Sequence, residues 1–275
     1  MLKRISFKYV AIVLCALLFI LPVWWIAVSA LRPEDDIFKY LSPLSLWTFL
    51  PKHVTFENII DIWKGSFGLA IWNSIFISGV TLILGLLISA SAAFALAVIE
   101  FPLRNFIFMT MVVSFLIPFD AIAVPLYAIL RSWGLQNTYT GLILPGIGNG
   151  LAVFLLRQFF MGIPRELREA ALVDGMSWVG IFFRIYIPLA VPALVSAALI
   201  LFVFQWHAYL WPLLIAPDNQ HKVAAVAIAQ FSDIYETRYG QIFAAALFIS
   251  LIPMIVLTVF QNHYSASLAS TGGKE

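Results

Sequence analysis

Charged residues and cysteine are scarce in this chain. Only 11% of its 275 residues are charged and one is a cysteine, whereas 62% are hydrophobic. The single cysteine, Cys15, allows no internal disulfide and no metal cluster built on thiolates. A soluble domain of this length cannot bury so much apolar surface, so the composition indicates a protein whose solvent is the lipid bilayer. The net charge of +2 gives no indication of nucleic-acid binding.

Motifs for catalysis and nucleotide binding are also missing from the sequence. It has no Gly-x-x-x-x-Gly-Lys-Ser/Thr loop, and its tail 272–275, Gly-Gly-Lys-Glu, is too short and lacks the helix that must follow. His, Asp and Cys residues do not cluster as metal ligands, and no nucleophile and base fall on neighbouring turns. We therefore predict no catalytic residue, no metal site and no cofactor bound by this chain, which disfavours a membrane-embedded enzyme.

Six apolar runs are long enough to cross a bilayer as helices, which takes about 20 residues each. Their apolar residues do not alternate with a period of two, which excludes the strands of a barrel. The predicted fold class is therefore an all-α integral membrane protein with six transmembrane helices. The runs span residues 9–31, 71–99, 106–130, 140–160, 189–215 and 242–260.

The loop charges predict how the chain is oriented. The first run follows a basic head, as in a cleaved signal peptide, but its apolar stretch is longer than a signal core, so we expect it to be kept as a span. Six spans place both ends of the chain on one side of the membrane. That side carries nine Lys and Arg against five Asp and Glu, and the opposite side seven against eight. Because a basic excess marks the cytoplasmic side, both termini and the loop 162–188 are predicted to be cytoplasmic.

We expect one transmembrane domain over residues 1–275, with its core at 71–262. The outer loop 32–70 is rich in proline and tryptophan, which suggests a partly folded cap with a short amphipathic helix at 56–63. Small residues in the second run allow close helix packing, either within the bundle or against a partner subunit. No inverted repeat relates the two halves, which weakens the case for a secondary transporter built on that symmetry.

The loop 162–188 is the most elaborate segment between two spans. Pro164 suits the first turn of a helix, and Gly175 suits its end because glycine accepts the left-handed conformation, which predicts a helix over 164–174. Ser177 can cap a second helix directly after the glycine. Two short helices that meet at a glycine form a compact projection rather than a flexible loop.

Other residues of this loop allow two interpretations. Leu167, Ala170 and Ala171 are spaced to form one apolar stripe, and Pro188 is expected to close the second helix and open the fifth span. Glu169 lies four residues after Arg165, where an ordinary intrahelical ion pair explains its charge. From the residues alone, the loop is either a stiff projection or an amphipathic hairpin on the membrane surface.

Polar side chains inside the apolar runs are candidates for a solute path. Asp120 follows Pro118 in the third run, and with Pro125 further along, the two prolines are expected to bend or break this helix. The Asp120 carboxylate can accept hydrogen bonds from a polyol, be solvated near the outer interface, or pair with a partner helix. Asn149, between two glycines in the fourth run, either lines the path or hydrogen-bonds a neighbouring helix.

The fifth run mixes amide, imidazole and aromatic groups at Gln205, Trp206, His207 and Tyr209. In a continuous helix Gln205 and Tyr209 share one face, and Phe202, Trp206 and Tyr209 share another. Aromatic faces with a few hydrogen-bonding groups suit a sugar, which is apolar on its ring faces and polar on its rim. The alternative stays open that these residues collect at the membrane interface because they are amphipathic. His207 has no second ligand at helical spacing and is not a metal site.

The loop 162–188 also carries a specific motif. It has Glu-Ala-Ala at 169–171, then three residues, Gly175, nine residues, and Ile-Tyr-Ile-Pro at 185–188. This pattern resembles the EAA loop of bacterial ABC importer permeases, with Ile187 in place of the Leu of the family motif. The segments 101–105, 125–127, 134–139 and 211–214 resemble the carbohydrate-uptake branch, the maltose-type and glycerol-phosphate-type permeases. The resemblance covers nearly the whole chain.

The resemblance implies a six-helix permease subunit of the bacterial cytoplasmic (inner) membrane. Its implied partners are a second permease, which we expect to be a different chain, two ATPase subunits that hold ATP and Mg²⁺, and an extracytoplasmic solute-binding protein. In that family the EAA loop docks into a cleft on the ATPase. The coupling residues carried over to this chain are Glu169, Ala170, Ala171, Asp174 and Gly175, and we add Arg165 and Ser177. Many relatives have Asn where His207 stands, which puts a transferred hydrogen-bonding role in doubt.

Two functions follow from the sequence. The favoured function is ATP-driven import of a sugar or glycerol-linked solute, such as an oligosaccharide, a polyol, glycerol phosphate or a glucosylglycerol-like compound. The alternative is a secondary carrier or channel that works without an ATPase. Such a carrier needs its own coupling-ion site, and Asp120 is the single carboxylate within the predicted spans.

Overall fold

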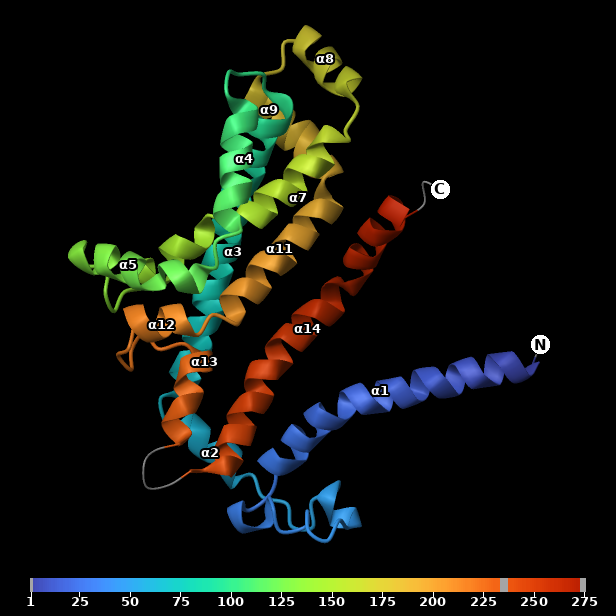
Figure 1. Ribbon diagram of the computed structural model, residues 1–275, viewed down its shortest axis with the longest axis vertical. Coiled ribbons are helices and arrows are strands. Elements are labelled where there is room, and N and C mark those ends of the chain that lie inside the picture. Colours follow the sequence, from blue (N-terminus) through green and yellow to red (C-terminus); the bar gives the residue numbers. More distant parts are fainter. Residues whose placement is uncertain (1, 233–236, 273–275) are drawn as a thin grey trace. The chain divides into compact units, whose positions relative to one another are not determined.

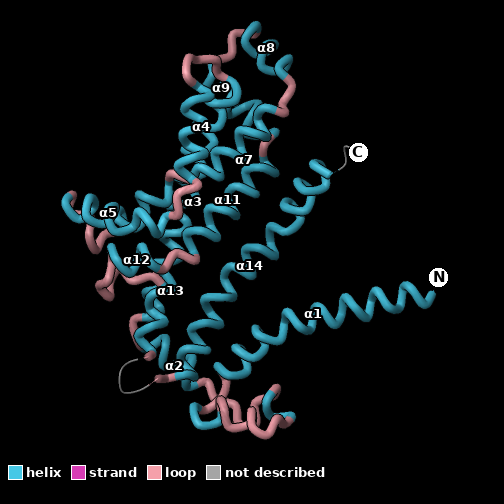
Figure 2. The backbone as a smooth tube through the Cα atoms, viewed as in Figure 1, coloured by secondary structure: helices cyan, strands magenta, loops and turns pink. Residues whose placement is uncertain are grey.

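A computed structural model describes residues 2–232 and 237–272, which are helices joined by loops and turns apart from one isolated bridge (Figure 2). The described chain divides into two compact units. One unit combines Met1–Ile71 with Val223–Ile252, and the other combines Trp72–Lys222 with Pro253–Glu275. Two long helices contribute residues to both units.

The first unit contains the N-terminal helix and the outer loop. Its helices are α1 (Leu2–Ala30), η1 (Glu34–Asp36), η2 (Leu46–Thr48), α2 (Glu57–Lys64), α13 (Ala224–Ala227), η5 (Ile228–Phe231) and the first parts of α3 (Phe67–Val98) and α14 (Tyr239–Gly272). Figure 1 labels the α-helices among them. The short helix predicted at 56–63 is confirmed as α2. Its buried residue Ile62 joins Phe67 and Ala245 in the core of this unit.

A buried arginine organises the outer loop of the first unit. Arg32 is fully buried, and its guanidinium donates to the backbone carbonyls of Ile37, Trp47, Thr48 and Leu50. A buried charge is tolerated when its hydrogen-bonding groups are paired, so the loop wraps around the guanidinium with its carbonyls turned inward. This explains how a segment with little regular structure keeps one shape.

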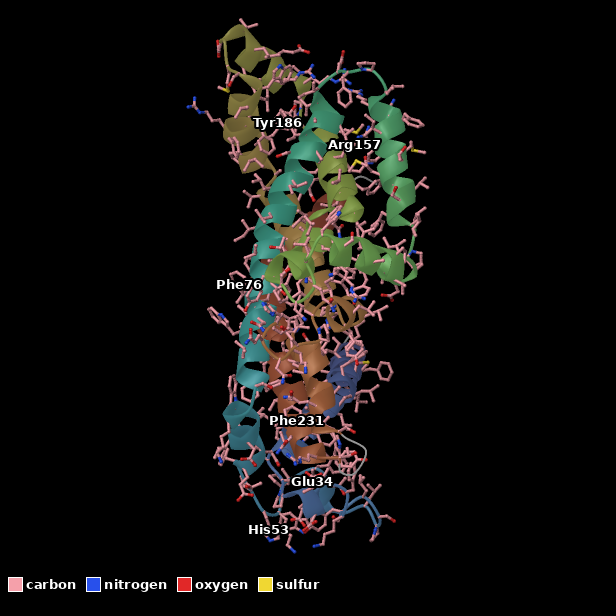
Figure 3. All side chains as sticks on the ribbon, turned by 90° about the vertical axis from the view of Figure 1, so that its left-hand side faces the viewer. Glu34, His53, Phe76, Arg157, Tyr186 and Phe231 are labelled. Atoms are coloured by element: carbon pink, nitrogen blue, oxygen red, sulfur yellow. The ribbon has the colours of Figure 1, made fainter. Side chains whose placement is uncertain are left out.

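Glu34 joins the outer loop to the beginning of α14. Its two carboxylate oxygens accept hydrogen bonds from the backbone N–H groups of Tyr239 (2.7 Å) and Gly240 (2.8 Å). A carboxylate at a helix N-terminus satisfies free N–H groups and faces the positive end of the helix dipole. Figure 3 labels Glu34, His53 and Phe231 in this unit.

The second unit contains most of α3 and the central part of the chain. Its other helices are α4 (Arg104–Phe115), α5 (Phe119–Ser132), α6 (Tyr139–Ile143), η3 (Leu144–Ile147), α7 (Gly150–Met161), α8 (Arg165–Val173), α9 (Trp178–Ile181), η4 (Phe182–Tyr186), α10 (Ile187–Leu189), α11 (Val191–Trp206), α12 (Leu210–Ile215) and the last part of α14.

Within the described residues, four helical segments are long and apolar enough to cross a membrane. They are Phe7–Ala30, Phe67–Val98, Tyr139–Met161 and Tyr239–Gln261. Two bent pairs pass the same test: α4 with α5, which meet at 98°, and the Trp178–Leu189 segment with α11, which meet at 84°. When each bent pair is one crossing, the number reaches six. The prediction of an all-helical membrane fold is confirmed.

The predicted course of two spans needs correction. In the third run the helix does break before Pro118, which is the N-cap of α5, but Pro125 lies inside α5 and does not interrupt it. In the fifth run the helix ends at Trp206, and His207, Ala208 and Tyr209 separate α11 from α12. The continuous helix assumed for that run is therefore wrong, and so are the two faces predicted to include Tyr209.

An aromatic cluster forms part of the core of the second unit. The ring of Phe94 on α3 lies with its centroid 5.0 Å from that of Tyr186 and 5.1 Å from that of Phe182, both on η4. Phe160 on α7 packs against Tyr186 at 5.6 Å. The two contacts of Tyr186 are edge-to-face, and such packing stabilises contacts beyond the area that it buries. The second half of the loop 162–188 is thus packed firmly on α3 and α7.

Candidate functional site

The EAA loop, residues 162–188, folds as predicted in its first half. α8 follows Pro164 and has Asp174 as its C-cap. Gly175 has a φ of 76°, in the left-handed region, and a Cβ there would meet no atom within 4 Å. The Ser177 hydroxyl accepts a hydrogen bond from the N–H of Gly180 (3.2 Å) and so caps α9. The predicted helix, glycine turn and serine cap are confirmed, except that Pro164 and Asp174 flank α8 as its N-cap and C-cap instead of lying within it.

α8 presents apolar side chains at the surface. Leu167, Ala170, Leu172 and Val173 are exposed, Val173 to 88%, whereas Ala171 is buried. Of the predicted apolar stripe, only Ala171 therefore packs inward. In Figure 1, α8 lies at the end of the second unit, beyond α4 and α9. Exposed apolar groups on a projecting helix are typical of a surface that another protein covers.

The charges on α8 pair differently from the prediction. Glu169 is exposed, and its Oε1 lies 3.4 Å from Nη2 of Arg168. The ion pair expected between Arg165 and Glu169 is therefore wrong, since among the ion pairs of the described residues Glu169 pairs with its chain neighbour. Arg165 and Asp174 are exposed at the two ends of the helix. A surface pair of this kind contributes little to stability, so Glu169 is available to a partner.

The helical structure in the second half of the EAA loop ends later than expected. Helical structure continues from α9 through η4, a π-helical turn, and α10, so that Pro188 lies inside α10. The chain then bends by 84° at Ala190 before α11. The prediction that Pro188 closes the second helix is wrong by one residue.

Asp120 lies on α5, whereas Gln205 and Trp206 lie at the end of α11. Asp120 is exposed in the first turn of α5. Its neighbour Phe119 packs edge-to-face on Trp211 of α12, with ring centroids 5.9 Å apart. The carboxylate thus lies near the N-terminus of α5, where a negative charge is favoured. Its position explains why the residue is tolerated in an apolar run.

Asn149 has a local structural role. Its Oδ1 accepts a hydrogen bond from the N–H of Ala152 (3.0 Å), which makes it the N-cap of α7. Neither role weighed from the sequence was that of a cap, although Asn is among the best N-cap residues. The side chain is partly exposed, so the cap does not remove it from the candidate path.

Gln205 and η3 approach each other closely. A Cβ on Gly146 would lie 2.5 Å from Oε1 of Gln205 and 2.8 Å from Cγ2 of Thr81. Only glycine therefore leaves room at this position for the amide in its present place. Trp206 is buried and stacks on Phe202, with centroids 5.6 Å apart, whereas Tyr209 is exposed. The structure thus places Gln205 against η3 and Trp206 in the core.

His207 borders a cavity of about 690 Å³ between α7, α11 and the last part of α14. The cavity is mostly apolar, with carbon side chains such as Leu151 and Phe204. Ser196 and Gln261 are its other polar residues, and the Ser196 hydroxyl donates to the carbonyl of Pro192 within its own helix. A wall of this kind offers little hydrogen bonding to a sugar. Among the described residues, no group of three or more His, Cys, Asp or Glu is placed to hold a metal ion.

One polar residue with a structural role, Asn73, was not identified from the sequence. Asn73 on α3 is fully buried, and its Nδ2 donates to the carbonyls of Gln220 (2.8 Å) and Lys222 (3.0 Å). Tyr139 on α6 donates its phenolic proton to Oδ1 of Asn73 across 2.9 Å. An amide inside a predicted span was the available signal, because a buried amide must find partners.

Comparison with protein families gives one match over most of the chain. The model described as "Binding-protein-dependent transport system inner membrane component" matches residues 85–270. The arabinooligosaccharides transport system permease protein AraQ of Halalkalibacterium halodurans is 31% identical over 274 residues, which cover 99% of this chain and 95% of the relative. The sn-glycerol-3-phosphate transport system permease protein UgpE of Pectobacterium atrosepticum is 30% identical, with 96% of each chain covered.

Two solved structures have a similar fold. A chain in the crystal structure of a bacterial ABC transporter involved in the import of the acidic polysaccharide alginate has a TM-score of 0.81 at 21% identity, covering 95% of this chain and 97% of that chain. A chain of a bacterial alginate ABC transporter in complex with an alginate pentasaccharide-bound periplasmic protein has a TM-score of 0.61 at 18% identity, covering 97% and 96%. At these identities the likeness shows the fold.

Proposed function

The chain belongs to the family of binding-protein-dependent transport system inner membrane components, and we propose that its cargo is a sugar or a glycerol-linked solute. It is a permease subunit of an ABC importer, a multi-pass protein of the inner membrane and not an enzyme. Membership of this family decides against a carrier or channel that works without an ATPase. The cargo proposal is supported by relatives named for arabino-oligosaccharides and for glycerol 3-phosphate.

The proposed assembly contains four kinds of subunit. Two ATPase subunits hold ATP and Mg²⁺ and drive the permease, and a second permease of different sequence completes the translocation path. An extracytoplasmic solute-binding protein delivers the cargo, which is supported by a similar fold in a transporter crystallised with its periplasmic protein. Residues 1–275 then form one permease domain whose termini and EAA loop lie in the cytoplasm. The orientation is supported by the basic excess on that side.

The shape and the exposed surface of α8 support the proposed contact with the ATPase. The helix is short, ends at a left-handed glycine, and leaves Leu167, Ala170 and Val173 uncovered. A flexible loop absorbs a displacement, whereas a short capped helix passes it on to the helices on which it is packed. We assign the coupling role to Glu169, Ala170, Ala171, Asp174 and Gly175, with Arg165 and Ser177 as supporting residues.

The proposed solute path needs groups from both permeases. Gln205, His207 and Tyr209 flank the break between α11 and α12, and Asn149 begins α7. Asp120 begins α5, and Trp206 supports the break from the core. A polyhydroxyl solute requires many hydrogen-bonding partners, and the cavity beside His207 is mainly apolar. The facing polar groups therefore come from the second permease.

A reconstitution experiment tests this function. The complete complex is placed in vesicles with its binding protein, and ATP hydrolysis and solute uptake are measured with a panel of disaccharides, polyols and glycerol phosphates. We expect one class of solute to stimulate both rates together. Glu169→Gln should lower both, whereas Glu166→Gln, in the first turn of the same helix, serves as the matched control. Uptake that proceeds without ATP hydrolysis would overturn the proposal.

A further inference from the structure

Three arginines from three different helices meet at one end of α3. The Nε of Arg157 on α7 donates to the carbonyl of Leu96 (3.2 Å), and Nη1 of Arg168 on α8 donates to that of Val98 (3.1 Å). Nη1 of Arg104, the first residue of α4, donates to the carbonyl of Ile99 (3.3 Å). Figure 3 labels Arg157 in this region.

The chemistry of a helix end explains why arginines collect there. The last carbonyls of a helix have no intrahelical partner and form the negative end of its dipole. A guanidinium supplies a permanent positive charge and several N–H groups in a rigid plane. Each of these hydrogen bonds therefore has a charged donor and an acceptor polarised by the helix, and is stronger than a neutral one.

Two of the arginines are held in place by more than a hydrogen bond. Arg157 is only 8% exposed, and its guanidinium carbon lies 3.9 Å from the centroid of the Phe108 ring on α4. The Arg168 side chain is 17% exposed and also meets Glu169, the first residue of the Glu-Ala-Ala motif. The contact with α3 is thus made by the residue directly before the motif.

The part of α3 that belongs to the second unit begins at Trp72, and this end is also bonded to a loop. Asn73 donates to the carbonyls of Gln220 and Lys222 and accepts from Tyr139. α3 has 32 residues, roughly 48 Å at 1.5 Å per residue, and no proline within its bounds. One uninterrupted helix therefore joins the EAA loop to the segment that follows α12.

We propose that α3 is the rod that carries motion of the EAA loop through the permease, and that Arg168 is the positioning residue that fastens α8 to it. Displacement of α8 then moves the end of α3 directly, besides acting on α7 and α9, which are its neighbours along the chain. The aromatic contacts of Phe94 with Phe182 and Tyr186 hold the far side of the same loop on α3. This inference rests on the proposed contact between α8 and the ATPase.

A distance measurement tests the connection without reference to transport. In a Cys15→Ser background, spin labels are placed at Val173→Cys on α8 and Ser91→Cys on α3, two exposed positions of the second unit. In the assembled complex we expect a narrow distance distribution that keeps its width when nucleotide binds. Arg168→Met should broaden it, and Arg168→Lys, which keeps a charged donor, should largely restore it.

The same variants are then measured for transport. Arg168→Met should lower the solute carried per ATP hydrolysed by roughly tenfold, the factor expected when a charge-assisted hydrogen bond is lost. The matched control is Arg184→Met, an exposed arginine of the same loop. A narrow distribution and wild-type stoichiometry in Arg168→Met would overturn the inference. If α8 does not contact the ATPase, Glu169 variants lose no coupling, yet the Arg168→Met broadening remains, so the two failures are distinguishable.

Discussion

The phenol of Tyr139 donates a hydrogen bond to Oδ1 of Asn73, which in turn holds two carbonyls of the 217–222 segment. Tyr139→Phe keeps the ring contact with Phe76, whose centroid is 5.2 Å away, and leaves a buried amide oxygen with one partner fewer. We expect the free energy of unfolding to fall by ~1–2 kcal/mol. Thermal unfolding of the solubilised chain measures it, with Tyr9→Phe on the exposed α1 as the control. An unchanged unfolding temperature would show that the hydrogen bond contributes nothing.

Gly175 and Gly134 form a natural pair for testing the coupling loop. Both have a positive φ, 76° and 73°, and a Cβ at either would meet no atom within 4 Å. Alanine at either position therefore costs only backbone strain, about 1–2 kcal/mol. Because Gly175 sets the direction of α8 and Gly134 lies in a turn after α5, we expect only Gly175→Ala to reduce uptake per ATP. Equal uptake losses in the two variants would mean that strain alone is responsible.

A substitution at Gly146 tests whether Gln205 belongs to the solute path. Alanine at Gly146 must displace the Gln205 amide, whose Oε1 would lie 2.5 Å from the new Cβ. We expect the KM for solute to rise by roughly tenfold, the effect of losing one well-placed hydrogen bond. Gly148→Ala is the matched control, since a Cβ there would meet no atom within 4 Å. Uptake kinetics in vesicles measure both, and an unchanged KM in Gly146→Ala removes Gln205 from the path.

The pKa of one carboxylate in the outer loop, that of Asp36, can be tested through its effect on stability. His53 Nδ1 lies 2.7 Å from Oδ2 of Asp36, and this hydrogen bond is the largest cause that lowers the pKa of Asp36 below its usual 3.8. Burial raises the pKa and so opposes the shift, and the nearby Lys39 lowers it further. A folded pKa below the unfolded one stabilises the fold above pH 3.8, and the stabilisation is lost as the pH falls through the folded pKa.

His53→Ala should therefore unfold at a lower temperature than the wild type at about pH 5, because the pKa of Asp36 returns toward its usual value. The difference should shrink to nothing once the pH lies below the lowered pKa of Asp36. Thermal scans of the solubilised chain between these pH values check it, and Asp36→Asn should abolish the dependence. A difference that persists in strong acid would assign the effect of His53 to packing.

The sequence predicted the elements that depend on local chemistry. Pro164, Gly175 and Ser177 act through backbone geometry and caps within a few residues, so the first half of the EAA loop was predictable. The apolar runs are read from the order of residues along the chain without any tertiary contact, which explains why the membrane fold was also predictable.

The parts that the sequence did not predict depend on contacts between distant residues. The end of α11 at Trp206 has no proline or glycine beside it, so periodicity gave no signal for the break. Arg168 makes its hydrogen bond to a carbonyl 70 residues away, whereas the intrahelical spacing favoured the Arg165–Glu169 pair. A backbone acceptor carries no side-chain signature, so such a contact is visible only in three dimensions.

The most direct test of the account is to identify what α8 touches. A photo-crosslinking amino acid replaces Ala170 in the assembled complex in native membranes, and the same amino acid replaces Val113, an exposed residue of α4, as the control. After illumination, we expect the Ala170 position to be joined to a nucleotide-hydrolysing subunit and the Val113 position not to be. Crosslinks from Ala170 only to lipid or to permease chains would contradict this expectation.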